Sequence, residues 1–454
     1  MAHKTRIVIA QRAPLELPTQ VVPGDWSAYL MSGERSGFNS AEVGITEANA
    51  AQLRLHWKDH ADNRISSQPV RAFGLIFWGS WDGLEHATGL NGQEIWATNL
   101  GRTHACGSLI GVASTATAAA VTMKGTAAPM IFVGGGNASF YALNAFTGAV
   151  IWKTPLGSPP AAFIWSSPVP YHGSIYIGLS SLGDCPTVQG KVFQLDEATG
   201  TVQHVFDVVP NGCIGGGIWD SPTIDEGTGK LYFASGSPDT CWTTEPFVTS
   251  VIELRASDLS LVSYWQVPKS QWVIDSDFGS APTLFTAHIR GTVHTLVGIA
   301  HKNGIYYAFD RGNISAGPVW QAAIAQAGTC PSCGQGSISP SAWDGSRLYV
   351  AGGNTVIQGA KCSGGLRALN PSSGAVIWEH CLTDGPVLAA VAAVPGVVVV
   401  GEGRSLLVVS AKSGKMLFVY KDRGDQSTFD GAASISHGML YIGNFDGNLY
   451  AFGL

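Results

Sequence analysis

The chain has 454 residues, with 26 Lys+Arg against 32 Asp+Glu and a formal net charge of −6. Hydrophobic residues make up 45% and charged residues 13%, which excludes an intrinsically disordered chain, and the lack of a basic excess argues against a nucleic-acid partner. No uninterrupted apolar run reaches about 18 residues, because the longest, Val387 to Val400, is broken by Pro395 and Gly396. We therefore expect no membrane span.

Residues 1–45 contain Pro, Gly and Ser without a repeated pattern, and they predict an N-terminal segment that wraps the outside of one domain formed by residues 46–454. The apolar patch Ile7–Ala10 is too short for the hydrophobic region of a signal peptide. Either an export signal has been removed from this chain, or the protein is not exported by that route.

From Ile76 onward a single pattern recurs. It consists of an apolar strand, a turn, a second strand, a third strand that reads ALN or similar, the pair TG, and a last strand that ends in an aromatic residue. A repeat on this scale indicates stacked supersecondary units. Successive copies end at Trp96, Trp152, Phe206, Trp265, Trp320, Trp378 and Tyr420, and the last, LYIGNFDGNLYAFGL, stops before its final strand.

Each copy supplies four short strands with turn residues between them, and such sheets bury both faces when they pack radially. Eight copies predict an all-β fold, an eight-bladed β-propeller. Leu53–Trp57 has the pattern of the strand that the eighth copy lacks, so we expect it to close the ring. We interpret the terminal tryptophans as packing residues between blades: Trp57, Trp96, Trp152, Trp320 and Trp378.

Eight cysteines permit four disulfides, and disulfides favour an oxidising compartment, which points to a periplasmic or secreted protein. Cys330 and Cys333 have C-x-x-C spacing without a second metal-binding pair, so a short-range disulfide is favoured over zinc. Cys185 with Cys213, and Cys362 with Cys381, are plausible further bridges. The sequence leaves the full connectivity open.

The repeat resembles that of quinoproteins, the propeller enzymes that carry pyrroloquinoline quinone (PQQ). The segment Gly215–Ser237 is similar to the part of quinoprotein alcohol dehydrogenases, including the polyvinyl-alcohol type, that holds a floor tryptophan and a calcium ligand. SQWVIDSDFGSAPTLF and His301–Asn313 resemble the two segments that follow. The resemblance implies that PQQ stacks on a tryptophan, that calcium polarises its carbonyl, and that a carboxylate takes the proton of an alcohol.

The resemblance places particular residues in these roles. Trp219 corresponds to the floor tryptophan and Lys302 to the basic residue beside the quinone carbonyls. Asp184 corresponds to a calcium-binding Glu. Asp275 and Asp277 lie where the family has an acidic cluster, and they are the candidates for the base.

The chain also departs from the family pattern. Ser237 replaces the calcium-ligand Asn. The stretch with the catalytic Asp is missing, and Glu245, which stands near its place, is a candidate substitute for that base. The pair of adjacent cysteines that covers the quinone is reduced to Cys106, and no C-x-x-C-H haem motif occurs, so any electron acceptor is external.

These features predict PQQ-dependent oxidation of a small-molecule or polymeric alcohol. The alternative is a propeller without cofactor that serves as a binding or assembly scaffold, and it is favoured by the replaced Asn, base and cysteine pair. A third interpretation keeps the funnel for another ligand, because a fold does not determine a function.

Overall fold

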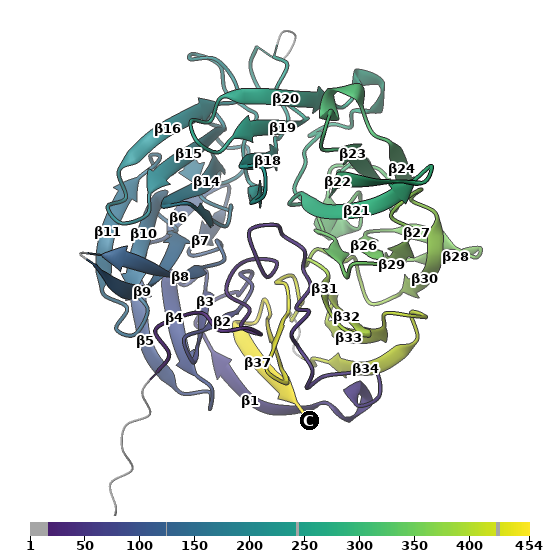
Figure 1. The fold of residues 1–454 in the computed structure, drawn as a ribbon, viewed down its shortest axis with the longest axis horizontal. Coiled ribbons are helices and arrows are strands. Elements are labelled where there is room, and N and C mark those ends of the chain that lie inside the picture. Colours follow the sequence, from purple (N-terminus) through teal and green to yellow (C-terminus); the bar gives the residue numbers. More distant parts are fainter. Residues whose placement is uncertain (1–16, 124, 242–244, 424–426) are drawn as a thin grey trace, which may run out of the picture.

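The computed structural model describes residues 17–123, 125–241, 245–423 and 427–454. These residues form eight antiparallel sheets around a central axis (Figure 1), so the expected all-β, eight-bladed propeller is confirmed. In each blade the first strand lies nearest the axis and the last lies at the rim. No helix in the described ranges is long and apolar enough to cross a membrane.

Blades 1 to 4 follow one another along the chain. Blade 1 contains β2 (Val70–Ala72), β3 (Leu75–Gly79), β4 (Leu84–Gly89) and β5 (Glu94–Asn99), and blade 2 contains β8 (Thr117–Met123), β9 (Thr126–Gly134), β10 (Ser139–Asn144) and β11 (Val150–Pro155). Blade 3 contains β13 (Val169–Tyr171), β14 (Ser174–Ser181), β15 (Lys191–Asp196) and β16 (Val202–Asp207), and blade 4 contains β17 (Thr223–Asp225), β18 (Lys230–Ala234), β19 (Ser250–Arg255) and β20 (Leu261–Gln266). The short strand β12 (Ala162–Phe163) also pairs with β14.

Blades 5 to 8 complete the circle. Blade 5 contains β21 (Thr283–Ile289), β22 (Thr292–Ala300), β23 (Ile305–Asp310) and β24 (Trp320–Ala323), and blade 6 contains β25 (Ala342–Trp343), β26 (Leu348–Gly352), β29 (Gly364–Leu369) and β30 (Val376–Leu382). Blade 7 contains β31 (Ala392–Val394), β32 (Val397–Glu402), β33 (Ser405–Ser410) and β34 (Met416–Lys421), and blade 8 contains β35 (Ser434–Ser436), β36 (Met439–Gly443), β37 (Asn448–Gly453) and β1 (Arg54–His60).

Shorter elements lie between the blade strands. Two hairpins extend from them, β6 (Thr103–Ala105) with β7 (Ser108–Ile110) and β27 (Thr355–Ile357) with β28 (Ala360–Cys362). The short 3-10 helices are η1 (Ala50–Gln52), η2 (Lys269–Gln271), η3 (Ile314–Ala316) and η4 (Pro331–Cys333).

The position of a strand in its blade follows from its residue pattern. The central strand β32 reads VVVVGE and is buried along its whole length, because neighbouring blades cover both of its faces. The rim strand β5 reads EIWATN and buries only Trp96. An apolar run therefore forms a central strand, and a mostly polar run with one large aromatic residue forms a rim strand.

Each rim tryptophan packs on the turn of the next blade. The indole of Trp96 donates to the carbonyl of Ala145 at 2.9 Å, and it covers Gly148, where a Cβ would lie 2.7 Å from the ring. Trp57, Trp152, Trp320 and Trp378 repeat this contact with Gly92, Gly200, Gly374 and Gly414. The turn glycine of one blade, preceded by Thr in two of the five cases, Ser in two and Asn in one, thus provides the flat surface for the tryptophan of the blade before it.

The predicted closing strand is confirmed. It is β1, which spans Arg54–His60 and so begins one residue later and ends three residues later than expected. It pairs antiparallel with β37 from Arg54 opposite Gly453 to His60 opposite Asn448. Strands from the two ends of the described chain therefore share the eighth blade.

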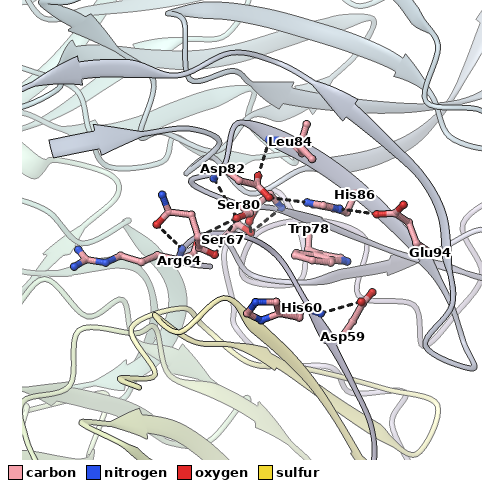
Figure 2. A network of polar contacts seen from close by, with 12 residues as sticks. Asp59, His60, Arg64, Ser67, Trp78, Ser80, Asp82, Leu84, His86 and Glu94 are labelled. Carbon is pink, nitrogen blue, oxygen red and sulfur yellow. Dashed lines mark hydrogen bonds and ion pairs between the residues drawn. The ribbon is translucent and has the colours of Figure 1, made fainter. Parts of the chain in front are cut away.

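Polar side chains hold the connection between β3 and β4 in blade 1 (Figure 2). Asp82 accepts the backbone N–H of Leu84 at 2.9 Å, and its other oxygen lies 3.6 Å from Nε2 of His86. The His86 ring stacks on Trp78 with 4.0 Å between centroids, and its Nδ1 lies 3.2 Å from a carboxylate oxygen of Glu94. This network stabilises the blade.

Within the described part of the N-terminal segment, residues 26–39 do not wrap the outside as expected. Residues 26–39, here called the strap, lie across the centre of the ring (Figure 1). The strap exchanges backbone or side-chain hydrogen bonds with the inner part of every blade, at Arg71, Ala118, Pro168, Ile224, Leu284, Trp343, Ala393 and Ile435. The expectation was wrong because the strap satisfies carbonyls and N–H groups that face the axis.

Candidate functional site

A cavity of about 500 Å³ opens among the loops of blades 3, 4 and 5. Here it is called the funnel. Six of the eight residues singled out from the sequence line it: Asp184, Trp219, Ser237, Asp275, Asp277 and Lys302. These residues come from five separate loops, and the blades bring them together because each loop enters or leaves a strand near the axis.

Trp219 forms one wall of the funnel, four residues before β17. Its indole is half-buried, and the ammonium of Lys302 lies 5.3 Å from the ring centroid. Gly279 borders the far edge of the indole, where a Cβ would lie 2.0 Å from the ring. The indole therefore lines the cavity and packs against the loop that leads into the next blade.

Two carboxylates face Lys302 within the funnel. Nζ of Lys302 lies 2.6 Å from Oδ2 of Asp275 and 2.9 Å from Oδ2 of Asp277. The backbone N–H of Ser237 donates to Oδ1 of Asp277 at 2.5 Å, and the hydroxyl of Ser237 lies 3.5 Å from Oδ1 of Asp275. One ammonium thus faces two acids, which leaves one negative charge uncompensated when both acids are ionised.

The surroundings shift the pKa values of the two aspartates in opposite directions. Burial, followed by the negative charge of Asp277, raises the pKa of Asp275 to about 7. Burial alone would also raise the pKa of Asp277, but the charge of Lys302 and several hydrogen bonds hold it below its usual value. Near neutral pH, Asp277 is ionised while Asp275 exchanges its proton, which is the behaviour that a general base requires.

Lys302 and its neighbour His301 are both buried. Burial would lower the pKa of Lys302, but Asp277 and Asp275 raise it above its usual value, so the ammonium stays charged. Burial lowers the pKa of His301 to about 4. Its Nδ1 accepts the N–H of Asn303 at 3.0 Å, and its Nε2 lies 3.5 Å from the hydroxyl of Ser276. A neutral His301 thus supports the loop that carries both aspartates.

Two of the four disulfides, Cys106–Cys185 and Cys213–Cys241, join segments beside the funnel. The bonds are Cys106–Cys185, Cys213–Cys241, Cys330–Cys333 and Cys362–Cys381. The expected pairs Cys330–Cys333 and Cys362–Cys381 are confirmed, whereas the pairing of Cys185 with Cys213 was wrong. The reason is tertiary: the hairpin β6–β7 brings Cys106 to the loop of Cys185, and the loop after β18 brings Cys241 to Cys213.

Two predicted site residues are not part of the described lining. Cys106 is exposed and bonded to Cys185, next to the lining residues Gly183 and Asp184. Glu245 is half-buried, and its backbone carbonyl accepts the side-chain amide of Gln266 at 3.0 Å. The roles assigned to these two residues stay predictions.

The sequence did not single out Trp165, which also lines the funnel. Its indole N–H points to the carbonyls of Ser181 and Leu182, both at 3.2 Å. Its ring contacts Phe163 and Trp81, which extends the aromatic wall away from the acids. The available signal was the parallel between IWSSP and IWDSP, at residues 164–168 and 218–222, because the second contains Trp219.

The chain is similar to proteins of known type. A family profile described as outer membrane protein assembly factor BamB matches residues 26–204, 84–236 and 302–454. A polyvinylalcohol dehydrogenase from Pseudomonas sp is 23% identical over 506 residues, which cover 94% of this chain and 74% of that relative. A quinohemoprotein alcohol dehydrogenase, ADH IIB from Pseudomonas putida, is 25% identical over 344 residues, which cover 65% of this chain and only 47% of that relative.

A solved structure supports the same fold. A europium-containing methanol dehydrogenase superposes with a TM-score of 0.75 at 17% identity, over 95% of this chain and 98% of that one.

Proposed function

Since this chain belongs to the family of PQQ-type, quinoprotein alcohol dehydrogenase-like propellers, we propose that it oxidises an alcohol in the funnel with PQQ as cofactor. One observation carries the proposal. An indole, an ammonium group and two carboxylates with separated acidities line one cavity of about 500 Å³. The substrate is a small-molecule or polymeric alcohol.

The residues present fit a flat, anionic cofactor. The indole of Trp219 offers a surface for stacking, and Lys302 offers a positive charge above the same ring. Gly217 and Gly236 also line the funnel and place no side chain in it. When bound, PQQ supplies an electrophilic carbonyl carbon that accepts two electrons from the alcohol.

The two acids are the candidate ligands for a metal ion. Asp275 and Asp277 provide more negative charge than Lys302 neutralises, and carboxylate and hydroxyl oxygens are the donors that calcium prefers. Ser237 would add a hydroxyl ligand, and Asp184 lies at the rim. The described residues contain no group of three or more acidic, His or Cys ligands, so a weakly held ion that needs further oxygen donors is expected. The family neighbour that contains europium makes a lanthanide the second candidate.

Asp275 and Asp277 have different tasks in this proposal. Asp275 accepts the hydroxyl proton of the alcohol, because its pKa of about 7 leaves it partly ionised at neutral pH. Asp277 stays ionised and fixes both Lys302 and the backbone of Ser237. Trp165 and Leu182 form the apolar wall against which the carbon chain of the substrate lies.

Electrons then pass to an external acceptor, since the sequence has no haem-binding motif. We also propose a periplasmic or secreted location. Four disulfides support it, because such bonds persist in oxidising compartments.

A scaffold without cofactor is the second candidate. The family description, an outer membrane assembly factor, and the thin set of metal ligands favour it. In that case the funnel would serve as a recognition surface, and oxidation would not occur.

One experiment separates the two candidates. The protein is titrated with PQQ in the presence of Ca²⁺ or La³⁺, binding is followed by fluorescence quenching, and oxidation of short alcohols and polyvinyl alcohol is measured with an artificial dye acceptor. Saturable binding that Trp219→Ala abolishes and Trp219→Phe partly retains supports the dehydrogenase. Failure of the wild-type protein to bind PQQ with either metal supports the scaffold, and oxidation that persists in Trp219→Ala contradicts stacking on Trp219.

A further inference from the structure

The strap contains a fully buried arginine that contacts the segments following two tryptophans of the funnel. Arg35 has no exposed surface. Its guanidinium donates to the carbonyls of Tyr29 at 2.6 Å, Pro222 at 3.0 Å, and Ser167 and Pro168 at 3.0 Å each. A buried charge is costly unless it is fully hydrogen-bonded, and this one is satisfied by carbonyls from three separate segments.

Two of these segments carry the tryptophans of the funnel. Ser167 follows Trp165 by two residues, and Pro222 follows Trp219 by three. The hydroxyl of Ser221 also accepts the backbone N–H of Ser167 at 2.9 Å, which ties the same two segments to each other. Arg35 therefore clamps, from below, the two stretches of chain that present Trp165 and Trp219.

Asp220 places a carboxyl group next to Trp219. It is buried, and its Oδ2 accepts the backbone N–H of Ala234 at 2.8 Å. Its Oδ1 has no hydrogen-bond partner among the described residues. Burial raises the pKa of Asp220 well above its usual range, and the Ala234 hydrogen bond and the charge of Arg35 oppose that shift. The carboxyl group is thus coupled electrostatically to the arginine of the strap.

The backbone of the strap is strained at this point. Leu30, Met31 and Arg35 have φ values of 53°, 80° and 55°, in the left-handed region that favours glycine. Non-glycine residues persist in that region only where the surroundings fix them, and such positions concentrate at functional sites. Leu30 of the strap packs with Ala281, Ala390 and Ala432, which precede the first strands of three different blades. The strap is therefore held in one conformation across the channel.

We propose that Arg35 is a positioning residue of the funnel, which fixes Trp165 and Trp219 relative to each other through the carbonyls of Ser167, Pro168 and Pro222. The inference that this spacing serves a flat quinone rests on the proposed function. The positioning itself does not, because it concerns two side chains of the protein alone.

The test compares Arg35→Lys and Arg35→Met with Asp220→Asn. Arg367→Met is the matched control, because Arg367 is also buried and donates to the carbonyl of Ile324 and the hydroxyl of Thr355 in blade 6, away from the strap. Hydroxyl-radical labelling read by mass spectrometry measures the reactivity of Trp165 and Trp219, with Trp152 as internal reference. Thermal unfolding confirms that each variant is folded at the labelling temperature.

We expect labelling of Trp165 and Trp219 relative to Trp152 to change by about tenfold or more in Arg35→Met, because the loss of even one hydrogen bond to a charged group carries about that factor and this variant loses four. Arg35→Lys and Asp220→Asn should give smaller changes in the same direction, and Arg367→Met should give none. Unchanged labelling in Arg35→Lys and Asp220→Asn, with stability lowered as in Arg367→Met, would overturn the proposal and leave Arg35 a purely structural residue.

A second measurement separates this inference from the proposed function. PQQ titration of the same variants should show affinity weakened by roughly tenfold in Arg35→Met, with the Arg367→Met value unchanged. If the wild-type protein does not bind PQQ, the proposed function fails while the labelling result still decides the role of Arg35. If PQQ binds equally well to wild type and Arg35→Met, the inference that the spacing of the two tryptophans serves the quinone is rejected although the proposed function stands.

Discussion

Gly279 lies against the edge of the Trp219 indole so closely that a Cβ at position 279 would be 2.0 Å from Cη2 of the ring. Its φ is not in the left-handed region, so a side chain is excluded by space and not by backbone conformation. The position of the indole in the funnel therefore depends on a residue from the following blade.

Gly279→Ala should displace the Trp219 indole, because the added methyl group overlaps the ring. We expect PQQ affinity to fall by roughly tenfold or more, with a shift in the near-ultraviolet circular dichroism. Gly227→Ala is the control, since a Cβ there would lie 3.5 Å from its nearest neighbour, a carboxylate oxygen of Asp225. Equal PQQ affinity in both variants would show that the indole does not hold the cofactor.

Asp275→Asn should remove the base. We expect kcat to fall by about 10²–10⁴-fold. In the wild-type protein kcat should rise with pH through about 7, because the acid must lose its proton before it can accept one.

The free energy of unfolding should instead fall as pH rises. The folded-state pKa of Asp275 is raised above its unfolded value, so its contribution is present at low pH and is lost as pH rises through about 7. Rate profiles and thermal unfolding from pH 5 to 9 check both signs.

Asp277→Asn should change the pH dependence of kcat through its neighbour Asp275. Removal of this negative charge should lower the pKa of Asp275, so the rise of kcat should move to lower pH. A pH profile that is identical to that of the wild-type protein would contradict the electrostatic coupling of the two acids.

Lys302→Met should leave two carboxylates without their cation. We expect weaker PQQ binding and tighter binding of Ca²⁺, because the metal would replace the lost ammonium charge. Isothermal titration with CaCl₂ measures the second effect. Lys230→Met is the matched control, since Lys230 pairs with Glu253 at 2.6 Å outside the funnel. Reduced Ca²⁺ affinity in Lys302→Met would argue against a metal site at these acids.

Trp96→Phe should destabilise the ring without affecting the funnel. The change removes the hydrogen bond to Ala145 and part of the contact with Gly148. We expect a loss of about 1–3 kcal/mol in the free energy of unfolding, measured by urea denaturation, and unchanged PQQ affinity in the folded protein. Val205→Ala, on an exposed rim strand, should cost much less. A large drop in PQQ affinity in Trp96→Phe would show that the blades do not behave as separate packing units.

Much of the candidate site could be predicted from the sequence because its motifs are local. Trp219 and Ser237 lie 18 residues apart around β17 and β18, and Lys302 follows β22 in a conspicuous turn. Such spacings persist when a blade folds, because the strands between them have fixed lengths. Trp165 was missed because no family motif marks it, and the contact of Cys106 with Cys185 was missed because 79 residues separate them.

The sequence by itself determined the number of blades, the closing strand, which it placed at Leu53–Trp57, and the inter-blade tryptophans, because each follows from periodicity within a repeat of about fifty residues. The tertiary structure alone decided that the strap crosses the channel, that Arg35 reaches the carbonyls beneath two tryptophans, and that two aspartates share one lysine. These contacts join residues distant in the chain, and closure of the ring creates them.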